Sequence, residues 1–239
     1  MQLGRLIGHR GACAYAPENT IASFEKARDL GCHFIEFDVM LSVEGEAFVF
    51  HDETLKRTTN GYGEFGLATT DYLQTLDAGS WFSENFRAEK IPTLRDTLDW
   101  LVASNMQANI EIKPFPGTTA KTATAVLSHL NRFWPSDRPL PLLSSFDMDA
   151  LTLCRSIVPE MPIGLLYHEW KTNWLKSARD LNPVSVHLNR RVISKARVQE
   201  IKQHGYKVCA YTVNRKNHAN KLFNWGVDTI FSDYPDLLS

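Results

Sequence analysis

Cysteine is scarce in this sequence, and the placement of the four that occur excludes several kinds of site. They stand at positions 13, 32, 154 and 209, far apart and with no Cys-x-x-Cys pair. This spacing argues against a zinc knuckle, a dithiol redox centre or a secreted scaffold held by disulfides. Four free thiols are typical of a reducing compartment, so we expect a cytoplasmic protein. A nucleophilic role for Cys13 is less favoured than a role as a small apolar core residue.

An excess of charge of one sign and long apolar runs are also missing. The 239 residues include 26 basic and 27 acidic side chains, so there is no basic field of the kind that nucleic-acid binding requires. No apolar run approaches the ~20 residues of a membrane span, and the first residues lack the regions of a signal peptide. We expect neither a nucleic-acid partner nor stable membrane insertion, and the composition carries no information on oligomeric state.

What the chain does have is an alternation of β-branched or aromatic segments with amphipathic segments, which is typical of βα units around a parallel sheet. We predict strands at residues 5–9, 34–39, 109–113, 141–146, 163–167, 184–189, 207–213 and 229–233. We predict helices over 18–31, 92–104, 194–205 and 215–226. Pro17 and Glu18 are expected in the first turn of the first helix, where both residue types are favourable.

Eight strands in a chain of 239 residues indicate a (β/α)8 TIM barrel, formed as a single domain over 1–239. The alternative is a doubly wound open sheet, which usually carries a glycine-rich phosphate loop after its first strand. Neither G-x-G-x-x-G nor a Walker A motif occurs here. The barrel is therefore the favoured fold.

One further strand-like segment, EAFVFHD at 46–52, follows the strand at 34–39 too closely for a parallel crossover. We predict an antiparallel hairpin with a two-residue Glu-Gly turn, which places Val43 opposite Glu46 and Asp38 opposite His51. The hairpin would return a histidine to the level of a carboxylate at the barrel mouth.

The residues after this hairpin, about 53–90, are rich in glycine, threonine and aromatic side chains. Some forty residues are too many for a plain loop in a compact domain. We predict a small insertion at the barrel mouth, with one short helix around 70–76.

Acidic residues alternate with apolar ones in two of the predicted strands. Glu36 and Asp38 share one face of FIEFDV, and Glu111 and Lys113 share one face of NIEIK. In an antiparallel sheet this pattern would indicate a solvated face. In a barrel it directs these side chains toward the axis, at the strand ends where barrel active sites lie.

Three carboxylates gathered at that place repel one another unless a proton or a cation is bound. An all-oxygen set of Glu36, Asp38 and Glu111 suits a hard divalent ion such as Mg²⁺ or Ca²⁺. Zinc more often recruits imidazole, and the first strand ends in His-Arg-Gly rather than in His-x-His.

His9 and Arg10 end the first strand, His51 returns through the hairpin, and Lys113 ends the third strand. Two imidazoles, two cations and a metal suit a phosphodiester, because positive charges neutralise the non-bridging oxygens. One histidine would remove a proton from the attacking oxygen and the other would protonate the leaving alkoxide. Of the other six histidines, only His187 is a candidate for lining the pocket, because it points from a predicted strand.

The motifs HRG…APENT, EFDV, HD and EIKP, followed by LLSSF, YTVN and GVDTIFSDYPD, resemble the glycerophosphodiester phosphodiesterase family. The resemblance runs from about residue 5 to 236. RTTNGYG, DAGSWF and VHLN are most similar to bacterial cytoplasmic glycerophosphoryl diester phosphodiesterases of this family. The resemblance implies a TIM barrel with an insertion after the His-Asp pair. It also implies metal-dependent hydrolysis of glycerophosphodiesters, such as glycerophosphocholine and glycerophosphoethanolamine, to sn-glycerol 3-phosphate and an alcohol.

The resemblance also implies a role for individual residues. The matched positions are catalytic His9 and His51, metal-binding Glu36, Asp38 and Glu111, and phosphate-contacting Arg10 and Lys113. On the resemblance alone His9 is the base and His51 the acid. Many relatives have tryptophan where this chain has Tyr211, which we expect to pack on the substrate. Phe146 has two equally favoured roles, in the pocket and in the barrel core.

Two other functions fit the same residues. A lysophospholipase would need an apolar entry surface, which the insertion offers in Tyr62, Phe65, Trp81, Phe82 and Phe86, although such aromatics more often form a small core. A binding protein without catalysis would need no histidine pair. Within the hydrolase, the glycerol hydroxyl could attack first and give a cyclic phosphate, or water could attack directly.

Overall fold

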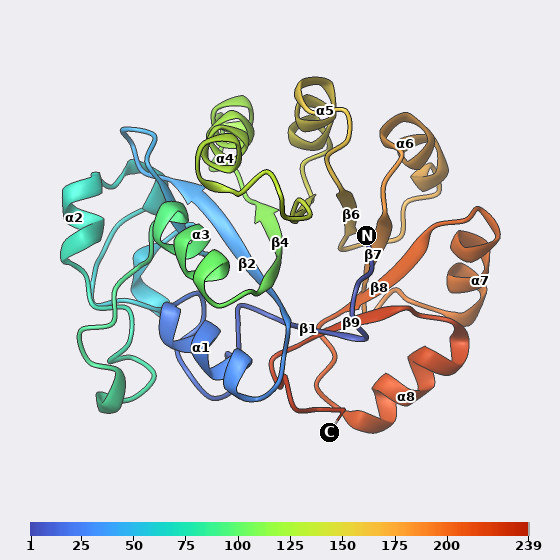
Figure 1. Cartoon of the computed structure of the whole chain (residues 1–239), viewed down its shortest axis with the longest axis horizontal. Coiled ribbons are helices and arrows are strands. Elements are labelled where there is room, and N and C mark those ends of the chain that lie inside the picture. Colours follow the sequence, from blue (N-terminus) through green and yellow to red (C-terminus); the bar gives the residue numbers. More distant parts are fainter. Residues whose placement is uncertain (239) are drawn as a thin grey trace.

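The computed structural model describes residues 1–238, and these form a closed parallel barrel (Figure 1). The barrel strands pair in the order β1-β9-β8-β7-β6-β5-β4-β2, and pairing of Gly8 with Ile35 joins β1 to β2 and closes the ring. They are β1 (Leu6–Gly8), β2 (Phe34–Leu41), β4 (Gln107–Ile112), β5 (Leu142–Ser145), β6 (Ile163–Tyr167), β7 (Ser185–Asn189), β8 (Lys207–Tyr211) and β9 (Thr229–Ser232). The prediction of a (β/α)8 barrel is confirmed.

Helices follow the strands and surround the sheet (Figure 1). They are α1 (Ile21–Asp29), α3 (Leu94–Ala103), α4 (Thr119–Phe133), α5 (Met148–Ile157), α6 (Trp174–Leu181), α7 (Lys195–Gln203) and α8 (Lys216–Trp225). In α3 the side chains of Leu94, Leu98 and Leu101 are fully buried, as their helical spacing predicts. Thr93 and Asp96 form a capping box at the N-terminus of this helix. Within residues 1–238 no helix is both long and apolar enough to cross a membrane.

The first helix begins later than predicted. Thr20 is the N-cap of α1 and its hydroxyl accepts a hydrogen bond from the Ser23 N–H, so Pro17 and Glu18 lie in the turn before the helix. The expectation for these two residues is therefore wrong. The threonine cap, a short polar side chain that satisfies a free amide, decides the start of the helix.

The hairpin forms as predicted, but its register differs by one residue. β3 (Ala47–Val49) runs antiparallel to β2 with Val39 opposite Val49, and the Phe50 N–H donates to the Asp38 carbonyl. Asp38 therefore faces residue 50 rather than His51. The loop has three residues, 43–45, and ends at Gly45 with φ +93°, a left-handed conformation that glycine adopts without strain.

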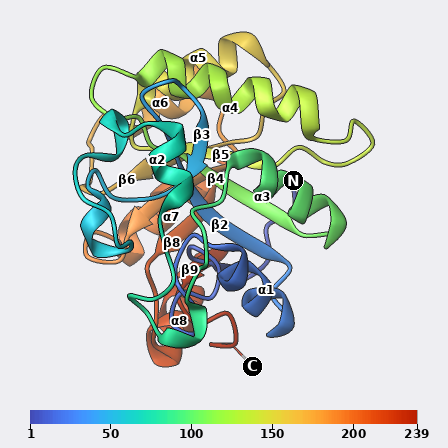
Figure 2. The ribbon, with the colours of Figure 1, turned by 90° about the vertical axis from the view of Figure 1, so that its left-hand side faces the viewer.

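Residues 53–90 contain only short elements, η1 (Leu55–Arg57), η2 (Phe65–Leu67), α2 (Thr70–Thr75) and η3 (Glu84–Phe86). The short helix predicted around 70–76 is confirmed. Phe65, Leu73 and Leu76 pack with Phe48 and Phe50 of the hairpin in a hydrophobic cluster separate from the main core. Figure 2 views the molecule from this side, with α2 in front. The cluster ties the segment to the hairpin that carries His51.

Candidate active site

The end of β1 is shaped by close contact with α1. A side chain at Gly11 would meet the Ser23 side chain at 2.5 Å, and φ at Gly11 is +86°. Arg10 has φ 51°, an uncommon conformation for a long side chain and one that often marks functional sites. This turn brings the Arg10 N–H to Glu36 Oε2 at 2.9 Å. The HRG sequence therefore forms a tight turn next to the acids of β2.

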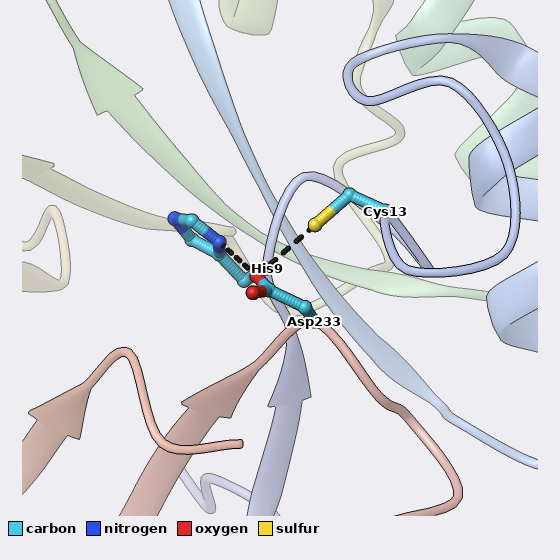
Figure 3. A group of neighbouring side chains, drawn as sticks. All are labelled: His9, Cys13 and Asp233. Atoms are coloured by element: carbon cyan, nitrogen blue, oxygen red, sulfur yellow. Dashed lines mark hydrogen bonds and ion pairs between the residues drawn. The ribbon is translucent and has the colours of Figure 1, made fainter. Parts of the chain in front are cut away.

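His9 is held by a carboxylate from the far end of the chain. Its Nδ1 lies 2.7 Å from Asp233 Oδ1, just after β9, and the Cys13 thiol donates to the same oxygen at 3.0 Å (Figure 3). Asn214 donates to the other oxygen of Asp233. Burial alone would raise the pKa of Asp233, but the hydrogen bond and charge of His9 hold it at about 2. The free nitrogen of the His9 ring points away from Asp233 (Figure 3).

Cys13 therefore acts neither as a buried apolar filler nor as an activated nucleophile. Burial and the neighbouring Asp233 raise the pKa of its thiol well above the ordinary value. A thiol held in the protonated form is a weak nucleophile and serves here as a hydrogen-bond donor.

His51 has an equivalent arrangement. Its Nδ1 lies 2.6 Å from Asp52 Oδ1, and Arg57 donates to both oxygens of Asp52. Arg57 also donates to both oxygens of Glu18, and Arg10 donates to Glu18 at 2.5 Å. Burial lowers the pKa of His51, against the opposing influence of Asp38 and Asp52. A chain of alternating charges thus connects the loops after β1 and β3.

The strand register brings the predicted acids together. Asp38 pairs with Glu111 across β2 and β4, and Glu36 lies two residues before Asp38 on the same face. One oxygen of each lies within 4.8 Å of the others, and all three side chains are buried. Burial and neighbouring acids raise the pKa of Glu36 well above its ordinary value and that of Glu111 to about 8.

Asp38 differs from the other two acids because cations surround it. Burial opposes its ionisation, but Arg10, His51 and Lys113 lower its pKa below the ordinary value. Arg10 Nε lies 3.4 Å and Lys113 Nζ 4.0 Å from its carboxylate. Asn19, whose φ is 58°, donates to Asp38 Oδ2 at 2.9 Å.

These three carboxylates fit a divalent cation. They offer only hard oxygen donors, and burial together with the neighbouring carboxylates raises the pKa of two of them, Glu36 and Glu111, despite the opposing charge of Arg10. The buried Oδ1 of Asn109, next to Glu36 across the sheet, has no hydrogen-bond partner among the described residues. A cation at this place would offset the repulsion between the carboxylates and would give Asn109 Oδ1 a partner.

His9, Arg10, Glu36, His51 and Glu111 line a pocket of about 520 Å³ at the C-terminal ends of the strands. This volume suits a small ligand. The opposite wall is formed by other residues, which are Phe146, Leu166, His168, Asn189, Arg190, Arg191 and Tyr211.

Phe146 and Tyr211 contact each other edge to face within this wall, with ring centroids 6.0 Å apart. The Phe146 side chain is 45% exposed, so it has the pocket role rather than the core role. Burial, with Glu111 nearby, raises the pKa of Tyr211, so its hydroxyl stays protonated. That hydroxyl has no hydrogen-bond partner among residues 1–238.

Two histidines were placed wrongly from the sequence. His187 is fully buried inside the barrel, where its Nε2 lies 2.8 Å from the Ser185 hydroxyl and burial lowers its pKa to about 3. His168, which had no assigned role, lines the pocket instead. Strand periodicity places a residue on the inner face of a barrel but does not fix its depth.

Other functional residues were missed as well. Glu18, Arg57 and Asp233 reach the site through contacts between distant parts of the chain. Asp52, which directly follows His51, and Asn109, which shares a strand face with Glu111, were given no role although local patterns place them there. Asp233 had one usable signal, because it directly follows the last strand at the end where barrel sites form.

The insertion aromatics lie in three separate places. Phe65 is fully buried in the cluster with the hairpin, and Phe82 contacts both Trp81 and Phe86 edge to face. Tyr62 is 74% exposed. The five residues therefore do not form one continuous apolar surface.

Comparison with known proteins decides the family. The chain matches the glycerophosphoryl diester phosphodiesterase family over residues 9–237. It belongs to this family. A glycerophosphodiester phosphodiesterase of Caldanaerobacter subterraneus is 35% identical over 237 residues, which cover 98% of this chain and 95% of that protein. One from Bacillus subtilis is 31% identical, with 97% and 84% covered.

Solved structures of family members agree with this placement. The structure of an Oleispira antarctica phosphodiesterase in complex with the product sn-glycerol-3-phosphate has a TM-score of 0.95 to this chain. It is 38% identical, and the match covers 98% of this chain and 94% of that one. The resemblance stated from the motifs is thus confirmed, and the chain is an enzyme of the phosphodiesterase class.

Proposed function

We propose that this enzyme hydrolyses glycerophosphodiesters, glycerophosphocholine and glycerophosphoethanolamine among them, to sn-glycerol 3-phosphate and an alcohol. The observation that carries the proposal is the pocket itself. Two histidines line it, each with a carboxylate on Nδ1, beside three buried carboxylates that fit a divalent cation. The product bound by the Oleispira antarctica relative is the one expected here.

The two His–Asp pairs supply the proton transfers. A carboxylate that accepts from Nδ1–H fixes the tautomer with Nε2 unprotonated, and it stabilises the ring when that nitrogen takes up a proton. One of His9 and His51 removes the proton of the attacking oxygen, which belongs either to water or to the neighbouring glycerol hydroxyl, and the other gives a proton to the leaving alkoxide oxygen. Attack by water gives sn-glycerol 3-phosphate directly, whereas attack by the hydroxyl gives a cyclic phosphate that a water molecule then opens. In both routes the phosphate stays on glycerol and the alcohol leaves.

Positive charge is needed at the phosphate because negative charge moves onto its oxygens during the reaction. Arg10 lines the pocket with its guanidinium fixed between Glu18 and Asp38, and we assign Arg10 and Lys113 to this task. Glu36, Asp38 and Glu111 would hold one Mg²⁺ or Ca²⁺. Such an ion supplies Lewis-acid polarisation of phosphoryl oxygens when bound.

The test is a coupled assay for sn-glycerol 3-phosphate with glycerophosphocholine as substrate, run as a titration with Mg²⁺ and Ca²⁺. We expect no turnover in excess EDTA, recovery with one of the ions, and loss of that recovery in Glu111→Gln. Unchanged activity in EDTA would remove the metal from the proposal. Lysophosphatidylcholine is included, and turnover of this lipid at the rate of glycerophosphocholine would favour the lysophospholipase function instead.

A second assay assigns the two histidines. A glycerophosphodiester with p-nitrophenol as its alcohol needs little protonation of the leaving oxygen. The histidine that acts as the acid can be replaced by alanine with activity on this substrate kept, whereas replacement of the histidine that acts as the base abolishes it. The family resemblance favours His51 as the acid. A trapped cyclic phosphate would show that the glycerol hydroxyl attacks first, and turnover of a substrate without that hydroxyl would show attack by water.

We further infer that the chain works as one catalytic domain in the cytoplasm. The contact of residues 53–90 with the hairpin that carries His51 supports a single domain. The four unpaired cysteines support a reducing compartment. Cell fractionation tests the location, and limited proteolysis tests whether 53–90 separates from the barrel.

A further inference from the structure

The wall of the pocket opposite the acids is built by the turn after β7. The Arg190 N–H donates to the Tyr211 carbonyl at 2.7 Å, and the Arg191 N–H donates to Asn189 Oδ1 at 2.9 Å. Asn189 Nδ2 lies 3.2 Å from His168 Nδ1 on the neighbouring strand end. These bonds fix the backbone of the turn, so two adjacent arginines are presented at the pocket.

Neither guanidinium of this pair is neutralised. In the part of the chain that the structure describes, no carboxylate lies within ion-pair distance of Arg190 or Arg191, and no side-chain hydrogen bond satisfies them. The arginines at the other side of the pocket differ, since Arg10 and Arg57 both bind Glu18. Exposed, unpaired guanidiniums on a backbone held beside a pocket can bind an anionic ligand, and arginine binds carboxylate and phosphate with two parallel hydrogen bonds.

The segment that contains this pair is rich in basic residues, of which Lys202 pairs with Asp228 and Lys207 begins β8 at the other end of the barrel. Residues 189–227 contain nine of the 26 basic residues of the chain but one of its 27 acidic residues. His218 is bordered by Arg190, Arg215 and Lys221, which, together with its burial, lower its pKa. Of the acids that line the pocket, Glu36 and Glu111 belong to β2 and β4, and the carboxylate of Asp233 is bound by His9, Cys13 and Asn214. Glu169 lies in an adjoining hollow together with Lys171.

We propose that Arg190 and Arg191 form a subsite for a second anionic group, a carboxylate or a phosphate, on the alcohol arm of the substrate. The inference rests on the proposed function. A phosphodiester between His9 and His51 has two arms, and glycerol, the arm common to all substrates, carries no charge. A charged subsite is useful only for the arm that varies. The enzyme then favours anionic alcohols over neutral ones, and neutral alcohols over cationic ones such as choline.

Three glycerophosphodiesters with alcohols of similar size test this order, namely those of glycolate, ethylene glycol and ethanolamine. We expect kcat/KM to fall in that order, with about tenfold between the anionic and neutral substrates, because a charge-assisted pair at a solvated pocket wall has an effect of this size. In the double variant Arg190→Gln/Arg191→Gln the preference for the anionic substrate over the neutral and cationic ones disappears. A substrate with a phosphorylated glycerol as its alcohol shows whether phosphate is bound better than carboxylate.

Arg179→Gln is the matched control, because Arg179 is an exposed arginine in the last turn of α6 and does not line the pocket. It should keep the full preference for the anionic substrate. Equal kcat/KM for the three substrates in the unmodified enzyme would overturn the inference alone. A preference that survives in the double variant would also overturn it, whereas no hydrolysis of any of the three would overturn the proposed function as well.

Discussion

The two walls of the pocket are built on opposite principles. On the wall from β1, β2, β3 and β4, charged side chains are held by other charged side chains, as in the series Arg10, Glu18, Arg57, Asp52 and His51. On the wall after β7, Arg190 and Arg191 are fixed through their backbone and their guanidiniums are left open. In Figure 1 the segment 53–90 lies at the left, while α7 and α8 lie at the right.

Under the proposed function, this difference separates catalysis from recognition. Groups that transfer protons must be held in one orientation and one protonation state before the substrate arrives, and paired charges provide both. Groups that recognise a variable part of the substrate need free hydrogen-bonding capacity, which pairing within the protein would remove. The following predictions test the paired wall, while those for Arg190 and Arg191 test the open one.

The largest effect is expected for His51→Ala. Loss of one proton-transfer group should lower kcat by about 10²–10⁴-fold on glycerophosphocholine. The melting temperature should change little, because His51 lies at the pocket surface outside the hydrophobic clusters. His33→Ala, an exposed histidine outside the pocket, is the control. If His51→Ala retained kcat, or lost its fold, the assigned role would be contradicted.

A smaller loss is expected for Asp233→Asn. The amide can no longer stabilise a protonated His9 or fix its tautomer, so kcat should fall by about 10–10²-fold with KM nearly unchanged. Cys13→Ala removes only one donor to Asp233 and should lower kcat a fewfold. Equal kcat in Asp233→Asn and the unmodified enzyme would show that Asp233 does not position His9.

The third prediction concerns stability rather than rate. With metal removed, Glu111 has a pKa of about 8 in the folded protein against 4.5 when unfolded. Between these values only the folded state binds the proton, so the free energy of unfolding should fall as pH rises from about 5 to 8. Glu111→Gln lacks this proton and should be more stable than the unmodified enzyme at pH 8 in EDTA, by on the order of 1–3 kcal/mol.

Urea unfolding in EDTA at pH 5 and pH 8 measures this difference, which should vanish at pH 5. Adding Mg²⁺ or Ca²⁺ at pH 8 should stabilise the unmodified enzyme more than the variant, since binding to the folded state raises its stability. Glu160→Gln, an exposed acid far along the chain, is the control for removal of one charge. A variant less stable than the unmodified enzyme at pH 8 would show that Glu111 is ionised and held by cations.

The sequence alone located side chains whose position depends only on their spacing within one strand. Glu36 and Asp38 share a face because side chains alternate along a strand, and the match of β2 with β4 places Glu111 beside Asp38. The hairpin was also predicted, but its register was wrong because a three-residue loop ending in Gly45 replaced the two-residue turn. A shift by one residue depends on loop geometry, which the apolar pattern of a strand buried on both faces does not reveal.

The sequence by itself determined the barrel and the family, because periodicity and short motifs are local properties of a chain. Only the tertiary structure decided which charges are paired and which are left open. Asp233 meets His9 across 224 positions, Glu18 meets Arg57 across 39, and Arg190 and Arg191 meet no acid in the described chain. The reason is physical, since an ion pair depends on a few ångströms of separation in space and is independent of separation along the sequence.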